Sequence, residues 1–359
     1  MIRLALLSCW NPYHTRSFVR DLAEFPEARL VAVWDDDHER GTAHAAEFGL
    51  PFEPNLTALL DRADIDGVII DSSPAQAASL IDLAAQAGKH ALADQTLAMT
   101  LREAEQVASH IRRANIRFAV DMSLKRWPVN LAAANAARSG ALGEVTCMRV
   151  RNAHHSAIAA TTSFASRFLD APYGVFSDLG AHGLYLTHDI LGRPDAVTAV
   201  VSRFTGHSAE DNAVCVMEYA NGTIAICETS YVAGQSPFAI ELYGTEGSFL
   251  GGGANGIHRK LLQPSDAVVR AYGMEEQAEL ARDASEMPDA AEASTLSKWL
   301  EAIELAKKRK ESNGSSAPDN DLPAEWNARL DDAIALAELL EALYLSAETG
   351  RKVYLRDFE

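Results

Sequence analysis

The first 125 residues alternate short apolar runs with longer segments in which apolar residues recur at helical spacing. The apolar runs cover 4–7, 29–34, 67–71, 90–94 and 117–122, and the clearest helical patterns cover 75–88 and 101–115. Uninterrupted apolar strands separated by helices are typical of a parallel sheet that is covered on both faces. With right-handed crossovers, the pattern predicts a doubly wound, Rossmann-type domain over residues 1–125.

After residue 125 the apolar runs are joined by turns more often than by helices. Strand-like runs cover 145–152, 196–204, 212–219, 222–232 and 238–243, and Asn221-Gly222 suits a tight hairpin. They predict a second, α+β domain over 126–359 with an open, mainly antiparallel sheet. We also expect loops at 251–256, a glycine run, and at 308–323, a polar stretch, followed by a long helix near 324–348 and a short strand at 352–355.

Composition and charge exclude several classes of function. Fifty acidic and 32 basic side chains give a formal net charge of −18, which repels phosphate backbones and anionic lipid. No apolar segment approaches the roughly 18 residues of a membrane span, and the first run is too short for a signal-peptide core. The four scattered cysteines are typical of thiols in a reducing compartment. We therefore expect a cytoplasmic protein with a small-molecule substrate and with neither a nucleic-acid nor a membrane partner.

The segment after the first apolar run, SCWNPYHTRSF, lacks the glycines of a dinucleotide-binding turn. Glycines at that turn permit positive φ and let a diphosphate approach the backbone, whereas Trp10 adds bulk at the second glycine position. Asn11 and Pro12 predict a capped helix start, in which the Asn11 side chain competes with a phosphate for backbone N–H groups. Two alternatives stay open: a dinucleotide held weakly, with His14 or Arg16 meeting a phosphate, or no dinucleotide at all. The candidate cofactor-binding residues here are Ser8, Trp10, Asn11 and His14.

An acidic residue, Asp35, ends the second apolar run in RLVAVWDDD. In a dinucleotide site, a carboxylate at that place accepts hydrogen bonds from the hydroxyls of the adenosine ribose. It also repels a 2′-phosphate, which favours NAD over NADP. The alternative interpretation is a solvated acid at the end of a strand.

Five segments of the chain carry a resemblance to a known family. They are EARLVAVWDDDHERGTAHAAEFGL, LLDRADIDGVIIDSSP, AAQAGKHALADQTLAMTLREAEQV, SDLGAHGLYLTHDILGRPDAV and LAELLEALYLSAETGRKVYL. They resemble the Gfo/Idh/MocA oxidoreductases, which include glucose–fructose oxidoreductase and inositol dehydrogenase. The resemblance implies a Rossmann domain followed by an open antiparallel sheet that often forms the oligomer interface. It also implies oxidation or reduction of a sugar, a polyol or a similar molecule with NAD(P), in a homo-oligomer such as a dimer or tetramer.

The chain differs from this family at positions that take part in the family's reaction. Where the family has an E-K-P tripeptide, this chain reads Asp94-Gln95-Thr96. The family's lysine helps to hold the reacting hydroxyl, and Gln95 can form a hydrogen bond there but brings no charge. A family histidine is replaced by Ala78. The resemblance still implies cofactor contacts at Ser73 and Asp94.

The block DLGAH keeps an acid and a histidine, Asp178 and His182. In the family this histidine is the general base, and the aspartate orients it or contacts the substrate. The i, i+4 spacing places both side chains on one face of a helix, so the carboxylate can fix the tautomer of the ring. The alternative is a structural pair at a helix start.

Three more residues are candidates for the reacting centre. Lys125, in SLKRWP, would return a cation to it, unless it is a surface lysine. His154 and His155 follow a strand of the second domain, and because neighbours on a strand face opposite ways, at most one of them points inward. That one would contact the substrate, or join Asp178 and His182 in a metal site. Because nothing in the spacing demands a metal, we predict none.

Three functional hypotheses follow from these observations. The first is an NAD-linked dehydrogenase or reductase of a sugar, polyol or similar molecule, with His182 as base. The second is a redox-neutral lyase, epimerase or hydrolase that uses the same histidine with or without bound NAD. The third is a non-catalytic binding relative. The Asp178–His182 pair argues against the third hypothesis, and Gln95 together with Trp10 argues against the first.

Overall fold

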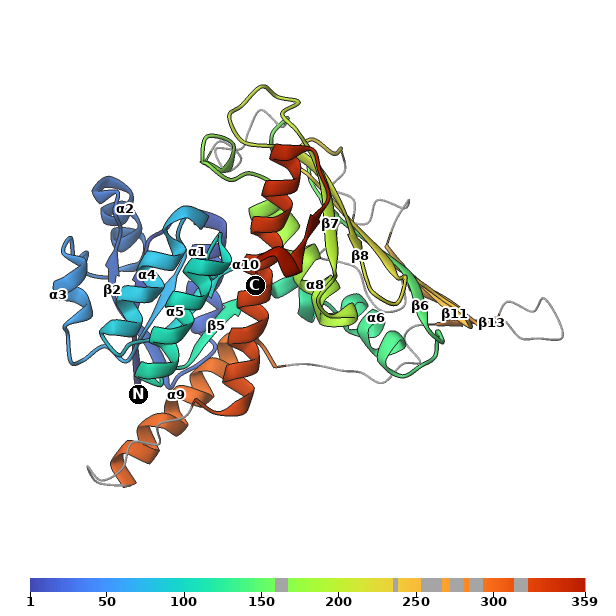
Figure 1. Cartoon of the computed structure of the whole chain (residues 1–359). Coiled ribbons are helices and arrows are strands. Elements are labelled where there is room, and N and C mark those ends of the chain that lie inside the picture. The colour runs from blue at the N-terminus through green and yellow to red at the C-terminus, as the bar shows by residue number, and fades with distance from the viewer. Residues whose placement is uncertain are drawn as a thin grey trace. The chain divides into compact units, whose positions relative to one another are not determined.

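The computed structural model describes residues 1–158, 167–234, 238–252, 267–271, 280–283, 293–312 and 322–358. By their contacts they form two units (Figure 1), one comprising Met1–Asp121 and Ala293–Ala337, the other Met122–Glu292 and Glu338–Glu359. The segment Ala293–Ala337, which we had expected in the second domain, joins the first unit because its helix packs against strands of the first sheet.

The first unit is built on a five-stranded parallel sheet in the order β2-β1-β3-β4-β5. Its strands are β1 (Ile2–Leu7), β2 (Ala28–Trp34), β3 (Gly67–Ile70), β4 (His90–Asp94) and β5 (Phe118–Asp121). Strands β1, β3 and β4 are buried along nearly their whole length, as continuous apolar runs between two layers of helices should be. The predicted doubly wound domain is confirmed.

The helices of the first unit are α1 (Pro12–Leu22), α2 (His38–Phe48), α3 (Leu56–Leu60), α4 (Pro74–Gln86), α5 (Leu101–Ala114) and α9 (Thr295–Ser312). Polar side chains cap the starts of four of them, whereas α4 begins at Pro74 without a side-chain cap. The side chains of Asn11, Asp37, Asn55 and Thr100 accept backbone N–H groups at the starts of α1, α2, α3 and α5. Helix α9, which the sequence did not predict, packs against β1, β4 and β5.

The strand order places a change of direction between β1 and β3. The chain passes from β1 to β2 on one side and then returns to β3 on the other side of β1. In sheets of this kind, ligands bind outside the carboxyl ends of the strands at the point where the order reverses. The segments that leave β1 at Ser8 and β3 at Asp71 therefore border the expected ligand crevice of this unit.

The second unit contains a nine-stranded mixed sheet in the order β13-β12-β11-β10-β6-β9-β8-β7-β14. Its strands are β6 (Val145–Ala153), β7 (Ala196–Ser202), β8 (Asn212–Glu218), β9 (Ile224–Ser230), β10 (Phe238–Gly244), β11 (Gly247–Gly252), β12 (Ala267–Ala271), β13 (Leu280–Asp283) and β14 (Val353–Tyr354). All neighbouring pairs are antiparallel except β6 and β9, which run parallel. The predicted α+β fold with a mainly antiparallel sheet is confirmed.

The helical elements with described bounds in the second unit include the 3₁₀ turns η1 (Ser123–Arg126) and η6 (Leu355–Phe358), the π-helical turn η2 (Phe176–Gly180), and the helices α6 (Pro128–Arg138) and α8 (Ala181–Leu191). The long helix α10 (Ala324–Thr349) belongs to the first unit up to Ala337 and to the second from Glu338. Helix α8 packs against α6 and against strands β6 and β9.

The predicted loops agree with the structure only in part. The glycine run at 251–256 begins inside β11, with Gly251 and Gly252, and its remaining residues lie outside the described part. Helix α9 extends to Ser312, into the segment 308–323 that was predicted to be a loop, whereas 313–321 lie outside the described residues. The hairpin between β8 and β9 is confirmed, with Gly222 at a φ of +86°.

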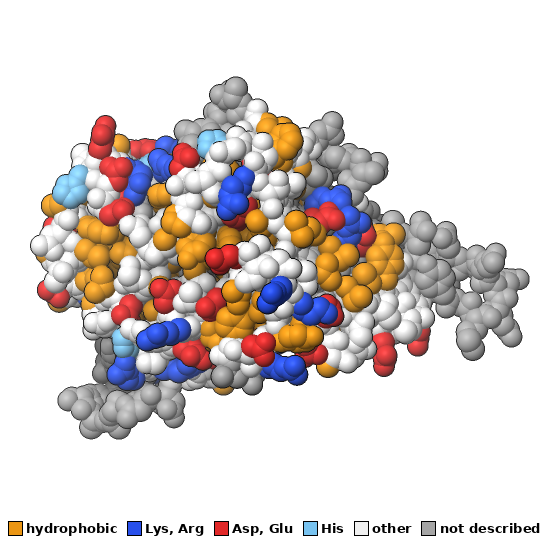
Figure 2. All heavy atoms as spheres, turned by 45° about the horizontal axis from the view of Figure 1, so that its top comes forward, with side chains coloured by type: hydrophobic (Ala, Val, Ile, Leu, Met, Phe, Trp, Pro, Cys, Tyr) orange, Lys and Arg blue, Asp and Glu red, His pale blue; other side chains and the backbone are white. Residues whose placement is uncertain are grey.

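No helix among the described residues is both long and apolar enough to cross a membrane. All four cysteines are thiols, three of them buried. On the face drawn in Figure 2, lysine and arginine side chains lie among aspartates and glutamates, so this face offers no continuous basic area to a nucleic acid.

Candidate functional site

The turn after β1 keeps the backbone shape of a glycine turn without a glycine. Ser8 has a φ of +65°, in the left-handed region that favours glycine. Its side chain is buried, and its hydroxyl has no hydrogen-bond partner among the described residues. Ser8 therefore stands where the first glycine would stand, at a cost in backbone strain and in an unsatisfied polar group.

The backbone N–H groups of this turn are bonded within the first unit. The N–H of Ser8 donates to Trp34 O at 2.7 Å, and that of Cys9 donates to Asp35 Oδ2 at 2.9 Å. Asp71 accepts the next two, that of Trp10 at its backbone oxygen at 2.9 Å and that of Asn11 at Oδ1 at 3.2 Å. Pro12 has no N–H, and those of Tyr13 and His14 donate to Asn11 Oδ1 at 3.1 and 3.3 Å. From Ser8 to His14, every N–H of the described backbone thus has a protein acceptor.

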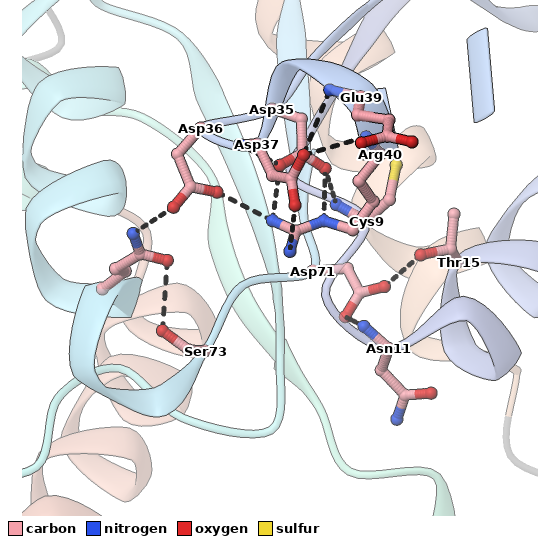
Figure 3. A network of polar contacts seen from close by, with 11 residues as sticks. Cys9, Asn11, Thr15, Asp35, Asp36, Asp37, Glu39, Arg40, Asp71 and Ser73 are labelled. Atoms are coloured by element: carbon pink, nitrogen blue, oxygen red, sulfur yellow. Dashed lines mark hydrogen bonds and ion pairs between the residues drawn. The ribbon is translucent and has the colours of Figure 1, made fainter. Parts of the chain in front are cut away.

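Asp71 is the buried acceptor behind the turn (Figure 3). Its carboxyl group accepts the N–H of Asn11 and contacts the Thr15 hydroxyl. Burial raises the pKa of Asp71 to about 8, and the negative charge of Asp94 adds to the increase. At neutral pH the Asp71 carboxyl is therefore mostly protonated, and it fills the space behind the turn as a neutral group.

Asp35 follows β2, as predicted, but its carboxylate is already bonded to the protein (Figure 3). Arg40 donates to it through Nε at 2.9 Å and through Nη2 at 2.5 Å, and Cys9 N and Asp37 N donate at 2.9 Å each. The Asp35 side chain is 0% exposed and that of Arg40 is 13% exposed. Burial raises the pKa of Asp35, and the Arg40 bonds partly offset this. The guanidinium of Arg40 also lies 5.8 Å from the centre of the Trp10 ring.

A second bridge connects the end of β2 with the start of α4 (Figure 3). Gln76 donates to Asp36 Oδ2 at 2.7 Å, and the Ser73 hydroxyl lies 3.1 Å from Gln76 Oε1. Asp36 also accepts from Arg40 at 2.8 Å. Ser73, a predicted cofactor contact, is thus linked to the acidic end of β2 through Gln76.

The predicted residues at the end of β4 join the same edge of the sheet. His14 Nδ1 lies 2.6 Å from Asp94 Oδ2, so the first turn of α1 is tied to the carboxyl end of β4. Gln95 is buried and has a φ of +65°, a second left-handed position without a glycine. Arg16, by contrast, pairs with Glu47 of α2 through Nε at 2.6 Å and Nη2 at 3.0 Å, on the exposed surface. Of the two residues proposed to meet a phosphate, His14 alone lies at this edge.

The second unit positions Asp178 through a residue that the sequence did not single out. Tyr231, which follows β9, donates its phenol hydrogen bond to Asp178 Oδ2 at 2.6 Å. Tyr231 is fully buried and Asp178 nearly so. Burial, followed by the charge of Asp178, raises the pKa of the Tyr231 phenol well above its usual value, so the phenol stays a donor. This contact fixes one carboxylate oxygen of Asp178.

Asp178 and His182 lie on either side of the change from the π-helical turn η2 to helix α8. Single π-helical turns inside helices occur often at functional sites. His182 is in the first turn of α8 and is 8% exposed. Gly180, between the two residues, is required by packing because a Cβ there would lie 2.9 Å from the Phe176 ring. The orientation of His182 by Asp178 stays a prediction.

The two adjacent histidines follow β6, which ends at Ala153. His154 stacks on Tyr231, with ring centres 5.0 Å apart and planes inclined by 22°. Its Nδ1 accepts the N–H of Ser156 at 3.3 Å, which places the ring proton on Nε2 in the neutral form. His155 is exposed. His154 is therefore brought next to the Asp178–Tyr231 pair.

Lys125 lies in the 3₁₀ turn η1 and pairs with Asp189 of α8, with Nζ and Oδ1 2.7 Å apart. Its ammonium also lies 5.4 Å from the centre of the Tyr185 ring. These contacts hold η1 against α8. In the described part of the chain, no group of three or more His, Cys, Asp and Glu side chains is arranged to hold a metal ion.

Two family models match the chain, one in each unit. The oxidoreductase family with an NAD-binding Rossmann fold matches residues 12–122, and the GFO/IDH/MocA C-terminal domain matches residues 130–250. Together these matches cover more than half of the chain. The chain belongs to the Gfo/Idh/MocA family.

Similar proteins agree with this assignment. D-apiose dehydrogenase of Paraburkholderia graminis is 25% identical over 371 residues, covering 99% of this chain and 90% of that protein. An oxidoreductase of Agrobacterium radiobacter, solved with NAD+, L-tartaric acid and magnesium, superposes with a TM-score of 0.72 at 21% identity, covering 100% and 99% of the two chains. Levoglucosan dehydrogenase, solved with NADH and L-sorbose, superposes with a TM-score of 0.74 at 20% identity, covering 99% and 98%. The expected family and fold are confirmed.

The cofactor of Gfo/Idh/MocA proteins fits this chain's first unit only in part. The sheet order suits a dinucleotide, but two features do not as they stand: the Asp35 carboxylate, predicted to accept the ribose hydroxyls, is 0% exposed and bonded to Arg40, and the described backbone of the turn after β1 offers no free N–H to a diphosphate. Its N–H groups are bonded to Asn11, Asp71 and other acceptors, and the Trp10 ring replaces a glycine. A diphosphate needs such N–H groups. The turn must therefore change before a dinucleotide can lie against it.

Sequence reasoning missed Arg40, Asp71 and Tyr231. For Arg40 a signal was present, because an arginine five residues after Asp35, in the first turn of a capped helix, can reach back to the acid. For Asp71, the acid directly after a buried strand was a weaker signal. For Tyr231 the sequence offered none, because its partner Asp178 is 53 residues away along the chain.

Proposed function

We propose that this protein is an NAD-linked oxidoreductase that acts on a sugar, a polyol or a related small molecule, with His182 as general base. Membership of an oxidoreductase family supports the reaction class. Full-length similarity to D-apiose dehydrogenase, and similarity to inositol 2-dehydrogenase over 62% of the chain, support the substrate class. The observation that carries the role of His182 is the ordered acid beside its helix: buried Asp178 with one oxygen fixed by Tyr231.

In this proposal, His182 takes the proton of a substrate hydroxyl on a ring nitrogen. Asp178, four residues earlier, stabilises the imidazolium that results, because an ionised carboxylate in a buried site interacts strongly with a nearby positive charge. Tyr231 keeps Asp178 in one orientation by donating to its Oδ2. A nicotinamide, where one is bound, supplies a hydride acceptor.

We assign supporting roles to three further residues of the predicted site. Gln95, in its left-handed conformation, would offer a neutral hydrogen bond to the substrate where the family has a charged lysine. His154, stacked on Tyr231, would offer a polar contact from Nε2. Lys125 is assigned to holding η1 on α8, because its ammonium is paired with Asp189.

A second function is favoured by two observations. The closed turn after β1 and the loss of charge at Gln95 both weaken the case for hydride transfer. A lyase, epimerase or hydrolase would need the acid–base pair alone, and His182 with Asp178 supplies one. This redox-neutral enzyme is our second proposal.

Binding and turnover of the purified protein test both proposals. NADH binding is followed by nucleotide fluorescence, and D-apiose, levoglucosan and inositol are then supplied with NAD+ as representatives of the relatives' substrates. We expect binding and slow reduction of NAD+. Conversion of a sugar by protein that binds no NADH would replace the first proposal by the second, and binding without turnover of any such compound would leave neither.

His182→Asn tests the assignment of the base. It keeps a polar side chain but removes the titratable ring, so turnover should fall by about 100-fold or more while NADH affinity stays nearly unchanged. His188→Asn, on the same helix, is the matched control and should retain turnover. Equal losses in the two variants would show that the helix, and not His182, is responsible.

We also propose that the protein is cytoplasmic and forms a homo-oligomer, a dimer or a tetramer, through the open face of its second sheet. The thiol state of its cysteines suits a reducing compartment. Val200, Ile224 and Tyr243, on strands β7, β9 and β10, have large exposed apolar surfaces. Sedimentation equilibrium would measure the subunit number, and a monomer at micromolar concentration would contradict this part of the proposal.

A further inference from the structure

In the turn after β1, the Asn11 side chain takes up the backbone N–H groups that a cofactor phosphate would need. Asn11 Oδ1 accepts the N–H groups of Tyr13 and His14, two of the donors that point out of the start of α1. The positive end of the helix dipole lies at these groups, and they are the natural partners of an anion. In this chain these two N–H groups donate instead to the neutral side-chain amide oxygen of Asn11.

The other donors of the turn are less easily released. The N–H of Asn11 itself goes to buried Asp71, and that of Cys9 goes to buried Asp35. Freeing either one would take a hydrogen-bond donor from a buried acidic side chain and disturb its other bonds, to Arg40 at Asp35 and to Thr15 at Asp71, whereas the two bonds to Asn11 are broken by rotation of one side chain. The two N–H groups held by Asn11 are therefore the first that a diphosphate can obtain.

The closed arrangement is also incompletely satisfied. Asn11 is 1% exposed, and its Nδ2 has no hydrogen-bond partner among the described residues. Its Oδ1 accepts two backbone donors, so the nitrogen and oxygen of the amide cannot be exchanged without losing both bonds. A buried amide nitrogen without an acceptor raises the free energy of the closed turn, which makes rotation of Asn11 out of the turn feasible.

We propose that Asn11 occupies the diphosphate position of the cofactor turn and sets the cofactor affinity, so that a dinucleotide binds only when the Asn11 side chain moves away. This inference rests on the proposed function in one respect, namely that the cofactor is NAD. It assigns to Asn11 a role in affinity and none in the chemical step.

Asn11→Gly provides the direct test. Glycine is itself tolerated at an N-cap, so helix α1 should persist while the two N–H groups become available. We expect NADH to bind about tenfold more tightly than to the wild-type protein, the gain of roughly two weak hydrogen bonds to a charged group. Asn55→Gly, which removes another asparagine N-cap of the first unit, is the control and should leave NADH affinity unchanged.

The second variant, Asn11→Asp, keeps the N-cap of α1, so its effect on NADH binding cannot come from loss of the cap. Aspartate keeps the two bonds to the helix start but adds a negative charge beside the diphosphate, so NADH should bind more weakly than to the wild-type protein. Adenosine, which has no phosphate, should bind the wild-type protein and Asn11→Gly with the same affinity, measured by its displacement of NADH. Circular dichroism would confirm that each variant keeps its helices.

Each outcome of these titrations decides the matter. Tighter NADH binding by Asn11→Gly and weaker binding by Asn11→Asp support the inference. An unchanged or weaker affinity in Asn11→Gly overturns it while leaving the NAD-linked function intact, provided that the wild-type protein binds NADH. Absence of NADH binding by the wild-type protein and by Asn11→Gly alike overturns the inference and the proposed cofactor together.

Discussion

The phenol of Tyr231 donates a hydrogen bond to Asp178 Oδ2 at 2.6 Å, and both groups are buried. Tyr231→Phe removes this donor without changing the packing volume of the ring. We expect the free energy of unfolding to fall by about 1–3 kcal/mol, because the buried Asp178 carboxyl group loses this hydrogen bond. If Asp178 orients His182, kcat should also fall, by about tenfold, with KM little changed.

The control for this change is Tyr219→Phe, in the hairpin loop between β8 and β9 of the same unit. The Tyr219 hydroxyl is also buried but has no hydrogen-bond partner among the described residues, so its removal should be neutral or slightly stabilising. Urea unfolding and steady-state kinetics measure both variants. A loss of stability in Tyr231→Phe without any change in kcat would assign to the contact a structural role alone.

The pH dependence of stability should carry the signature of Asp71. Its folded-state pKa, raised by burial to about 8, lies well above that of an unfolded aspartate, near about 3.9. The folded protein therefore binds this proton more tightly than the unfolded chain does. The contribution of Asp71 is most favourable in acid and is lost progressively as the pH rises from about 4 to about 8.

Asp71→Asn removes this dependence while keeping the shape of the side chain. The stability of the variant relative to the wild-type protein should increase between pH 5 and pH 8, as urea titrations at several pH values would show. The neighbouring titratable groups are Cys9, His14 and Asp94, and all three remain in the variant. Asp64→Asn is the control: this exposed acid has a pKa lowered to about 2 by Arg62, so its effect should be flat above pH 5.

The fold could be predicted from the sequence because it depends on local periodicity. Short continuous apolar runs such as 67–71, bounded by polar residues, indicate strands buried on both faces. The side chains that cap α1 and α2 act within three positions along the chain. Strands β12 and β13 and helix α9 were not predicted, although buried Leu296, Trp299 and Ile303 recur at helical spacing in α9.

The candidate site was predicted in its positions but not in its contacts. Ser8, Asn11, Asp35, Ser73 and Asp94 do lie at the carboxyl edge of the first sheet. Their bonds to each other and to Arg40 or His14 depend on side-chain rotamers and on which strands are neighbours. The Tyr231–Asp178 contact depends on the packing of η2 against β9, between residues far apart along the chain, which no local rule predicts.

Ser8→Gly should stabilise the protein. The left-handed φ of +65° is strained for serine, and the buried hydroxyl has no partner among the described residues. Relief of both effects outweighs the larger entropy of glycine in the unfolded chain, so we expect a gain of about 1 kcal/mol. Asn115→Gly is the comparison, at another left-handed position, where asparagine is well tolerated and caps α5. A loss of stability in Ser8→Gly would contradict the strain that the φ angle indicates.

Two arginine–carboxylate pairs of the first unit should contribute very differently to the free energy of unfolding. Arg40, 13% exposed, binds the fully buried Asp35 carboxylate, whereas the side chains of Arg16 and Glu47 are 54% and 39% exposed. Arg40→Met leaves a buried carboxylate without its cation, so the free energy of unfolding should fall by about 3 kcal/mol. Arg16→Met removes a pair that water and salt already screen, so its cost should stay below about 1 kcal/mol.

The same pair of variants separates burial from charge as the cause. Raising the salt concentration to about 1 M should reduce the cost of Arg16→Met towards zero, since exposed charges are then strongly screened. It should change the cost of Arg40→Met much less, because the loss there comes from an uncompensated buried charge. Lowering the pH should lessen the cost of Arg40→Met, because the Asp35 carboxyl can then take up a proton in place of its lost partner. If Arg40→Met and Arg16→Met lost the same free energy of unfolding at low salt, burial of the Asp35 carboxylate would not be the cause that we propose.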